Sequence, residues 1–394
     1  MNMFKDLTSA IKDNIRDYGM YIALAIIILI FTTLTNGLFI TPRVISDLID
    51  MTGYIAVLSV GMTLVIVIQH IDLSVGYIAG FLGAVAAILS SKVGMPLYLI
   101  FPVVLILGAL IGVVWTGTLV AKIKIPAFVA TLAAMTIFRG LLIRTTNSAT
   151  IFTDSDAFNA VGNGYIPDLF NNDHLHVLTI IIGVAVVLLY VIMEIRNRHK
   201  QVAYRLRVST LPIFIAKLVF VSAIVMYFIW KLASFKGFSW TAVIVAIVVV
   251  IYNFVTKNTT LGRHIYAVGG NPEAAELSGI SVKFITFVVF GSMGMLSGLS
   301  GLLFTARLQS ATPTAGMGFE LDAIAGAFVG GSSASGGVGK VTGSIIGALV
   351  MASLSKGMDL MNVGVSYQYI IRGLVLVAAV VFDVKTRNMR SKKA

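Results

Sequence analysis

The stretch "VLTIIIGVAVVLLYVIM", residues 177–193, decides the class of fold, because none of its 17 side chains carries a charge. An α-helix rises about 1.5 Å per residue, so a run of about 20 apolar residues crosses the hydrocarbon layer of a membrane. Similar runs recur along the chain, for example "MYIALAIIILIFTTLTNGLF" at 20–39. Of the 394 residues, 58% are hydrophobic and only 12% are charged, about half the charged share of a soluble domain. The sequence therefore predicts an all-α polytopic membrane protein.

Apolar segments define a transmembrane domain at 19–384, preceded by an N-terminal segment at 1–18 and followed by a basic tail at 385–394. The segment at 321–333 is too short to cross a bilayer alone, so we expect a tilted half-helix or a re-entrant segment there. The prediction is about 10–12 transmembrane helices, with short or broken helices near the centre. The expected segments are 19–37, 50–69, 74–91, 97–115, 126–144, 176–194, 212–232, 239–256, 284–305, 321–333, 341–357 and 367–384.

The distribution of Lys and Arg predicts the orientation, because cytoplasmic loops of membrane proteins are enriched in both residues. With the N-terminus inside, the inner segments hold 19 of the 29 Lys and Arg residues. Both termini are therefore expected in the cytoplasm, and the net charge of +12 reflects topology rather than nucleic-acid binding. The longest outer loop, at about 145–175, is acidic and large enough to form a docking rim for a soluble partner. The inner segments are 1–18, 70–73, 116–125, 195–211, 257–283, 334–340 and 385–394.

Several kinds of chemistry have no support in the sequence. The chain has no cysteine, which excludes disulfides, thiolate nucleophiles and cysteine metal sites. "ASGGVGKVTG" at 334–343 imitates a phosphate-binding loop, but Ala334 and Val341 replace two residues that the pattern needs. A glycine-rich turn between packed helices is the better interpretation. We expect no catalytic residue, no bound cofactor and no metal on this chain.

Two groups of polar residues interrupt apolar sequence, and intramembrane polar groups are functional candidates because they are costly to bury. Acids beside small residues suit interrupted helices that line a cavity, so one interpretation is a translocation pathway near both groups. The other is that the carboxylates cap helix N-termini, and the two are compatible. The candidates are Gln69, His70, Asp72 and Ser74 in "VIQHIDLSVG" and Glu320 and Asp322 in "GFELDAIAGAFVGG".

The segment 262–283, "GRHIYAVGGNPEAAELSGISVK", is polar and punctuated by glycine between two apolar runs. Asn271 can cap a short helix, Pro272 fits its first position, and Glu273 lies near its positive dipole end. Gly279 can end that helix. A short helix held by two flanking spans is a handle for another protein, although a simple surface turn is the alternative.

Together these motifs resemble a known family. "EAAELSGI" is similar to the motif by which permeases of ATP-binding-cassette (ABC) importers dock their ATPase. With "HIDLSVG", "IPAFVATLAAM…FRG", "ARLQSATPTAG" and "ELDAIAGAFVGGSSASGGVGKVTGSIIGALVM", the chain from about residue 50 to 384 resembles the ribose, xylose and multiple-monosaccharide permeases of that superfamily. The xylose and multiple-sugar branch looks closest, because two additional apolar segments lie within 176–256.

The resemblance implies a type II-like importer permease in the bacterial cytoplasmic (inner) membrane, which passes a monosaccharide such as xylose or a related pentose or hexose. It implies three protein partners: a second permease copy, forming a homodimer, an ABC ATPase that binds ATP and Mg, and an extracytoplasmic sugar-binding protein. The residues around Asp72 and Asp322 would lie by the central pathway. The residues implied to couple to the ATPase are Gly269, Gly270, Asn271, Pro272, Glu273, Ala274, Ala275, Ser278 and Gly279.

Two other functions share some of these features. A secondary transporter driven by an ion gradient also has broken helices and intramembrane acids, and Asp72 or His70 would then carry the proton. A membrane-embedded enzyme would need a catalytic constellation, which the sequence lacks. The coupling segment discriminates between an ABC permease and a secondary transporter.

Overall fold

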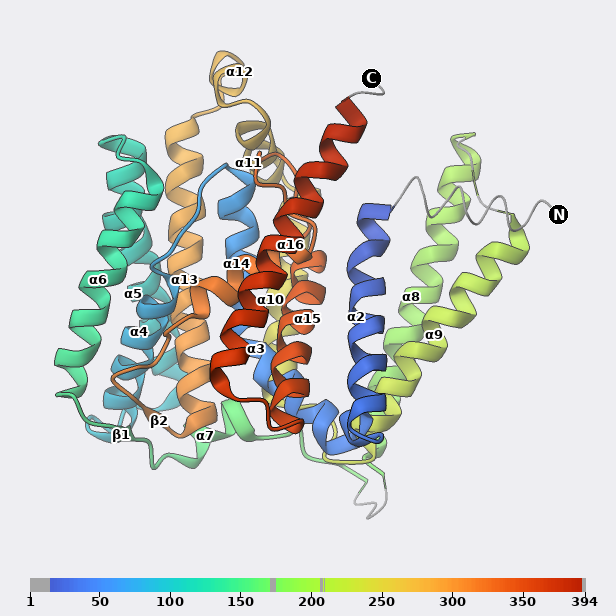
Figure 1. Ribbon diagram of the computed structural model, residues 1–394, viewed down its shortest axis with the longest axis horizontal. Coiled ribbons are helices and arrows are strands. Elements are labelled where there is room, and N and C mark those ends of the chain that lie inside the picture. Colours follow the sequence, from blue (N-terminus) through green and yellow to red (C-terminus); the bar gives the residue numbers. More distant parts are fainter. Residues whose placement is uncertain (1–14, 171–174, 206–207, 209, 392–394) are drawn as a thin grey trace.

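A computed structural model describes residues 15–170, 175–205, 208 and 210–391. Most of the expected N-terminal segment 1–18 and the end of the expected tail 385–394 lie outside these residues. Within them the chain is almost entirely helical (Figure 1), which confirms the all-α polytopic class.

Nine helices among the described residues are long and apolar enough to cross a membrane. Two shorter apolar helices accompany them, namely α4 (Val75–Ser91) and the part of α2 (Ile15–Leu34) that begins at Gly19. The 15-residue α5 and the π-helical η2 form one continuous span. The spans are α3 (Pro42–Val67), α5 (Leu97–Ile111) with η2 (Gly112–Lys122), α6 (Ala127–Thr146), α8 (Val177–Ala203), α9 (Leu211–Ala233), α10 (Trp240–Asn258), α13 (Val282–Leu308), α15 (Val341–Leu360) and α16 (Val365–Ser391).

Short elements occupy the two ends of the bundle and its middle (Figure 1). One end carries α11 and α12 and is called the α12 end. The opposite end carries α7 and the antiparallel pair of β1 with β2 and is called the α7 end. The half-helix α14 lies between the two ends. The bounds are η1 (Leu38–Ile40), β1 (Ile151–Phe152), α7 (Asp156–Asn163), α11 (Thr260–Gly270), α12 (Pro272–Leu277), β2 (Ser310–Ala311) and α14 (Phe319–Val329).

The core lies around α3 and α13. In the most apolar 18-residue stretch of each helix, 83% and 72% of the residues are buried. α13 packs against α3, α4 and α5, and it approaches them through small residues. A Cβ added at Gly294 would overlap the carbonyl oxygen of Gly108, and one added at Gly301 would overlap that of Ala79. The glycine-rich sequence of α13 therefore lets backbones touch, as expected of packed membrane helices.

Three differences from the segments expected from apolarity stand out. α3 begins at Pro42, eight residues before the expected start at 50, and α8 continues to Ala203, beyond the expected end at 194. Both extensions carry charged residues, and a run of apolar residues marks only the part of a helix that lies in hydrocarbon. α11 was not predicted; the Thr259 hydroxyl caps it by accepting a hydrogen bond from the Gly262 backbone N–H at 3.1 Å.

Candidate functional site

The short helix α12 has the local structure that the sequence predicted. The side chain of Asn271 accepts a hydrogen bond from the backbone N–H of Ala274 at 3.0 Å, and Pro272 is the first helical residue. Gly279 has a left-handed φ of 82°, and the N–H of Ile280 then donates to the carbonyl of Ala275 at 3.0 Å. This arrangement ends the helix after two turns and satisfies its last carbonyls.

α12 projects from the bundle, as Figure 1 shows, and most of its surface is open. Ala275 is buried, whereas Glu273, Ala274 and Glu276 are exposed. Leu277 is 90% exposed. A helix tip that combines an apolar side chain with two carboxylates offers a contact surface outside the membrane spans.

α11 connects α12 to the core through close backbone contacts. A Cβ added at Gly269 would overlap the carbonyl oxygen of Val67, which ends α3, and would lie 2.8 Å from the backbone nitrogen of Gly337. The side-chain amide of Gln69 donates to the Gly269 carbonyl at 2.8 Å. Gln69, grouped in the sequence with the acidic residues, therefore contacts the coupling segment.

The loop at 330–340, which contains most of the 334–343 stretch that imitates a phosphate-binding loop, packs against α11. The Gly337 N–H donates to the Val67 carbonyl at 2.9 Å, and the Tyr266 hydroxyl donates to the Gly339 carbonyl at 2.7 Å. Burial raises the pKa of the Tyr266 phenol. Ser333 donates to the carboxylate of Asp383 on α16 at 3.0 Å. The loop thus links α11 to α3 and α16, and its glycines serve helix packing.

Asp72 lies just before α4, whose N-cap residue is Ser74. Its carboxylate accepts from the backbone N–H of Ser74 at 2.9 Å and from the Ser74 hydroxyl at 2.5 Å. Both residues are buried, with Asp72 3% exposed. The neighbouring His70 is half-buried and its ring stacks on Phe290, with centroids 5.8 Å apart. Asp72 therefore positions the N-cap residue Ser74 and is not itself the cap of α4.

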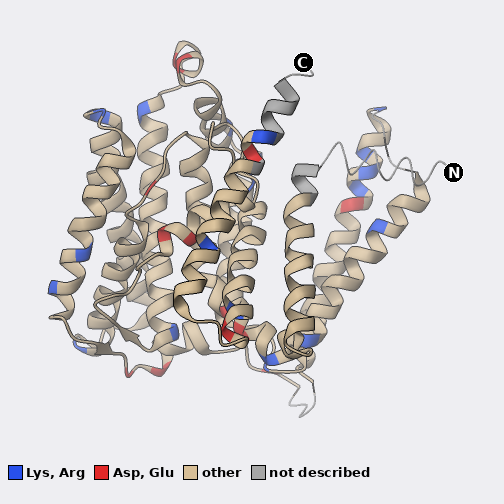
Figure 2. Cartoon of the chain, viewed as in Figure 1, with Lys and Arg blue, Asp and Glu red and all other residues tan. Residues whose placement is uncertain are grey.

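α14 begins at mid-height between the two ends of the bundle, where Figure 2 shows acidic residues beside a basic residue of α16. Asp322 forms an ion pair with Arg372 at 3.3 Å. Glu320 is 7% exposed, and its Oε2 has no hydrogen-bond partner among the described residues. A Cβ added at Gly76 would lie 2.5 Å from that oxygen. The first turn of α4 therefore meets the first turn of α14.

Three aromatic rings lie next to the start of α14. Tyr54, Phe304 and Phe319 come from α3, α13 and α14, and their ring centroids are 4.8 to 5.0 Å apart. Sequence reasoning missed these rings because aromatic residues are ordinary in apolar helices. It also did not single out Arg372, although a cation inside an apolar span indicates a buried partner.

A second polar cluster, missed from the sequence, ties the loop after α7 to the bundle. Asp50 on α3 is 3% exposed; it accepts a hydrogen bond from the Tyr165 hydroxyl at 3.4 Å and lies 4.0 Å from Arg307. Tyr165 also shares a hydrogen bond with Ser46 and forms a β-bridge with Ser239. Part of the expected docking rim is thereby held in place on α3 and α10.

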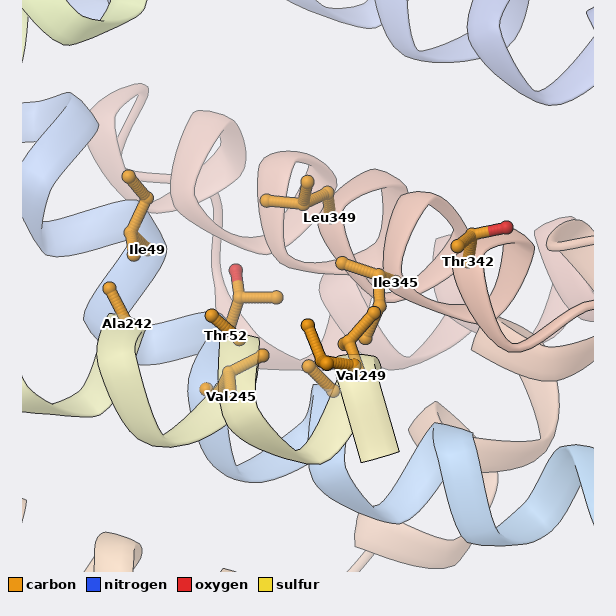
Figure 3. A pocket seen from close by; sticks show the side chains of 12 residues that line it. Ile49, Thr52, Ala242, Val245, Val249, Thr342, Ile345 and Leu349 are labelled. Carbon is orange, nitrogen blue, oxygen red and sulfur yellow. The ribbon is translucent and has the colours of Figure 1, made fainter. Parts of the chain in front are cut away.

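An apolar cavity of about 430 Å³ lies among α3, α10 and α15 (Figure 3). Its lining is mostly Ala, Val, Ile and Leu, with Thr52 and Thr342 as the polar members. The Thr52 hydroxyl already donates to the Leu48 carbonyl. Sugar hydroxyls need hydrogen-bond partners when they leave water, so this cavity is unsuited to a sugar.

Comparison with known proteins identifies the family to which the chain belongs. The family model described as "Branched-chain amino acid transport system / permease component" matches residues 44–380. The chain belongs to this family. It is a multi-pass membrane permease, which confirms the expectation of a transport subunit rather than an enzyme.

Curated relatives of the permease are named as sugar transport proteins. The xylose transport system permease protein XylH of Haemophilus influenzae is 37% identical over 375 residues, covering 95% of this chain and 98% of that protein. XylH of Escherichia coli K12 is 38% identical, with coverages of 95% and 93%. The ribose import permease protein RbsC of Escherichia coli K12 is 35% identical over 370 residues, covering 92% of each chain. No solved structure gave a significant match.

Proposed function

We propose that this permease is the membrane subunit of a binding-protein-dependent ABC importer that moves a monosaccharide into the cytoplasm, with ATP and Mg bound by a separate ATPase subunit. The observation that carries the proposal is α12, a capped helix that projects from the bundle and follows α11, whose Gly269 contacts the end of α3. The names of the relatives support xylose, ribose or a related sugar as the substrate.

We propose that the ATPase docks on Gly269–Gly279 and that α11 transmits its movement. The contacts of Gly269 with Val67 and Gln69 support one route, toward α3. The contact of Tyr266 with Gly339 supports a second route, through the 330–340 loop toward α14 and α16. A rigid link suits this role because packed interfaces pass small displacements on rather than absorbing them.

Glu320, Asp322 and Arg372 are proposed to line the sugar pathway, near the aromatic rings of Tyr54 and Phe319. Carboxylates accept hydrogen bonds from sugar hydroxyls, while aromatic rings contact the apolar faces of a sugar. Gln69, His70, Asp72 and Ser74 are proposed to lie along the same route, with Asp72 holding Ser74 at the start of α4. A second permease copy would close the pathway on the exposed side of α14 and α16.

Replacing Glu320 by Gln tests the pathway. The change removes the charge and preserves the shape of a side chain whose Oε2 has no partner in the described chain. We expect thermal stability to be unchanged or higher, because a buried charge is lost. Uptake affinity for the sugar should fall at least about tenfold, since one good hydrogen bond to a charged group contributes about 1.5–3 kcal/mol. Equal affinity in Glu320→Gln and the parent protein would remove Glu320 from the pathway.

We propose that both termini and the α12 end are cytoplasmic. Because the chain has no cysteine, single cysteines can replace Leu169 at the α7 end and Tyr204 at the α12 end, each 77% exposed. A membrane-impermeant thiol reagent applied to intact cells should label Leu169→Cys and not Tyr204→Cys. The reverse pattern would place α12 on the outer face, where no ATPase operates.

The ion-driven alternative is tested by energy source. Sugar uptake is measured in cells treated with a protonophore while ATP is maintained. An ABC importer should continue to take up sugar, whereas a proton-coupled transporter that uses Asp72 or His70 should stop at once. Immediate collapse of uptake would overturn the proposed function.

A further inference from the structure

The hairpin of α8 and α9 is the least embedded part of the permease. Among the described residues the two helices pack chiefly against each other, and α9 also contacts α3. In the most apolar 18-residue stretch of each of these helices, only 11% of the residues are buried. In Figure 1 the hairpin stands at the edge of the bundle, with α2 between it and α15. Most of its surface therefore faces lipid.

Polar residues begin at matching depths on the two helices. From Val177 to Glu194 the rise of α8 is about 26 Å, and from Ala233 back to Lys217 the rise of α9 is about 24 Å. Arg198 lies about 32 Å from Val177, close to the thickness of the hydrocarbon layer, about 30 Å. These side chains thus reach the headgroup level at the α12 end, where Figure 2 shows basic colour on both helices.

A cleft of about 220 Å³ opens between the helices at this level. Lys217 donates to the Glu194 carboxylate at 3.0 Å, and the Arg198 guanidinium lies 4.6 Å above the Phe214 ring. The ring and the carboxylate thereby hold both cations at the cleft. Its other polar lining comes from Asn197 and Gln201.

The surroundings of the cleft are strongly basic. Among the described residues from 194 to 217, Glu194 is the one acid, against five Lys and Arg residues: Arg196, Arg198, Lys200, Arg205 and Lys217. Below them the lipid-facing side chains are large and apolar, including Met193, Val219 and Phe220, each more than 60% exposed. The cationic groups lie at the depth of a phospholipid's anionic headgroup, and the apolar face lies at the depth of its acyl chains.

We propose that this cleft binds the phosphate headgroup of an anionic phospholipid, whose acyl chains lie along α8 and α9. Arg198 and Lys217 contact the phosphate oxygens, and Asn197 and Gln201 donate to the remaining headgroup oxygens. Glu194 competes with the phosphate for Lys217. Loop cations that serve orientation alone require no cleft. The headgroup would fill the cleft, and the acyl chains would cover the exposed apolar side chains of α8 and α9.

The test measures lipid binding to the purified full-length permease by native mass spectrometry, with phosphatidylglycerol and phosphatidylcholine added separately. We expect a preference for phosphatidylglycerol of at least about tenfold. Arg198→Gln/Lys217→Gln should remove that preference. A matched control, Lys257→Gln/Lys283→Gln, removes the same charge from exposed positions at the α12 end outside the hairpin and should keep it.

A single variant should strengthen lipid binding, and a gain of binding cannot be explained by misfolding. Glu194→Gln releases Lys217 from its ion pair, so phosphatidylglycerol binding should tighten several-fold. Weaker binding in Glu194→Gln, equal losses in both double variants, or no preference in the parent protein would overturn the proposal. Competition by inorganic phosphate at millimolar concentration would assign the cleft to a free anion instead of a lipid.

Discussion

Replacing Gly269 by Ala should disable transport. Its Cβ would overlap the Val67 carbonyl oxygen and lie 2.8 Å from the Gly337 nitrogen, and backbone atoms cannot rotate away as a flexible side chain can. The end of α11 must then move off α3 and the 330–340 loop, which strains the packing by about 1–3 kcal/mol. We expect sugar uptake to fall at least about tenfold and the melting temperature of the purified permease to drop.

A helical glycine outside the coupling segment supplies the control. A Cβ at Gly140 in α6 would meet no atom of the described residues within 4 Å, and alanine favours a helix more than glycine does. Gly140→Ala should therefore be neutral in both assays. If Gly269→Ala transported sugar at the normal rate with a normal melting temperature, the contact between α11 and α3 would have no part in coupling.

Replacing Leu277 by Asp should abolish assembly with the ATPase. Leu277 is 90% exposed in this chain, so the change removes no internal contact and should leave the folded permease intact. At the proposed interface a buried leucine would become a buried charge that lacks a partner. Truncating a central interface residue costs about 2 kcal/mol or more, which corresponds to roughly thirtyfold weaker association. Co-purification with the ATPase measures the loss.

Two variants keep this experiment interpretable. Leu277→Met retains an apolar side chain of similar volume and should assemble normally. Leu169→Asp introduces the same charge at an equally open leucine, 77% exposed at the opposite end of the bundle, and should still bind the ATPase. Normal ATPase recovery with Leu277→Asp would show that α12 is not the docking helix.

Local patterns in the sequence determined the fold class, the half-helix near 321–333 and the ends of α12. Each depends on neighbouring residues: the length of an apolar run, or the capping residues Asn271, Pro272 and Gly279. Such features are readable because helical hydrogen bonds join residues four apart. The family followed from the same motifs, since they occur in a specific order along most of the chain.

Only the tertiary structure decided which polar groups meet. Gln69 was grouped with Asp72 by proximity in sequence, yet its amide binds Gly269, 200 residues away. Asp322 is paired with Arg372, 50 residues away on another helix. An apolar run shows that a helix lies in the membrane. It does not show which helix lies beside it, because lipid and protein interiors are equally apolar.

The same distinction applies to the roles of individual carboxylates and cations. Asp72 and Glu320 both occur beside small residues in the sequence. Packing leaves Asp72 bonded to Ser74, whereas Oε2 of Glu320 has no partner among the residues that the structure describes. The basic run after residue 194 predicted orientation alone, and the cleft appears only when α9 brings Lys217 to Glu194. Sequence determined which residues a helix carries and how deep they lie, whereas tertiary packing decided their partners, because partners are chosen by distance in space.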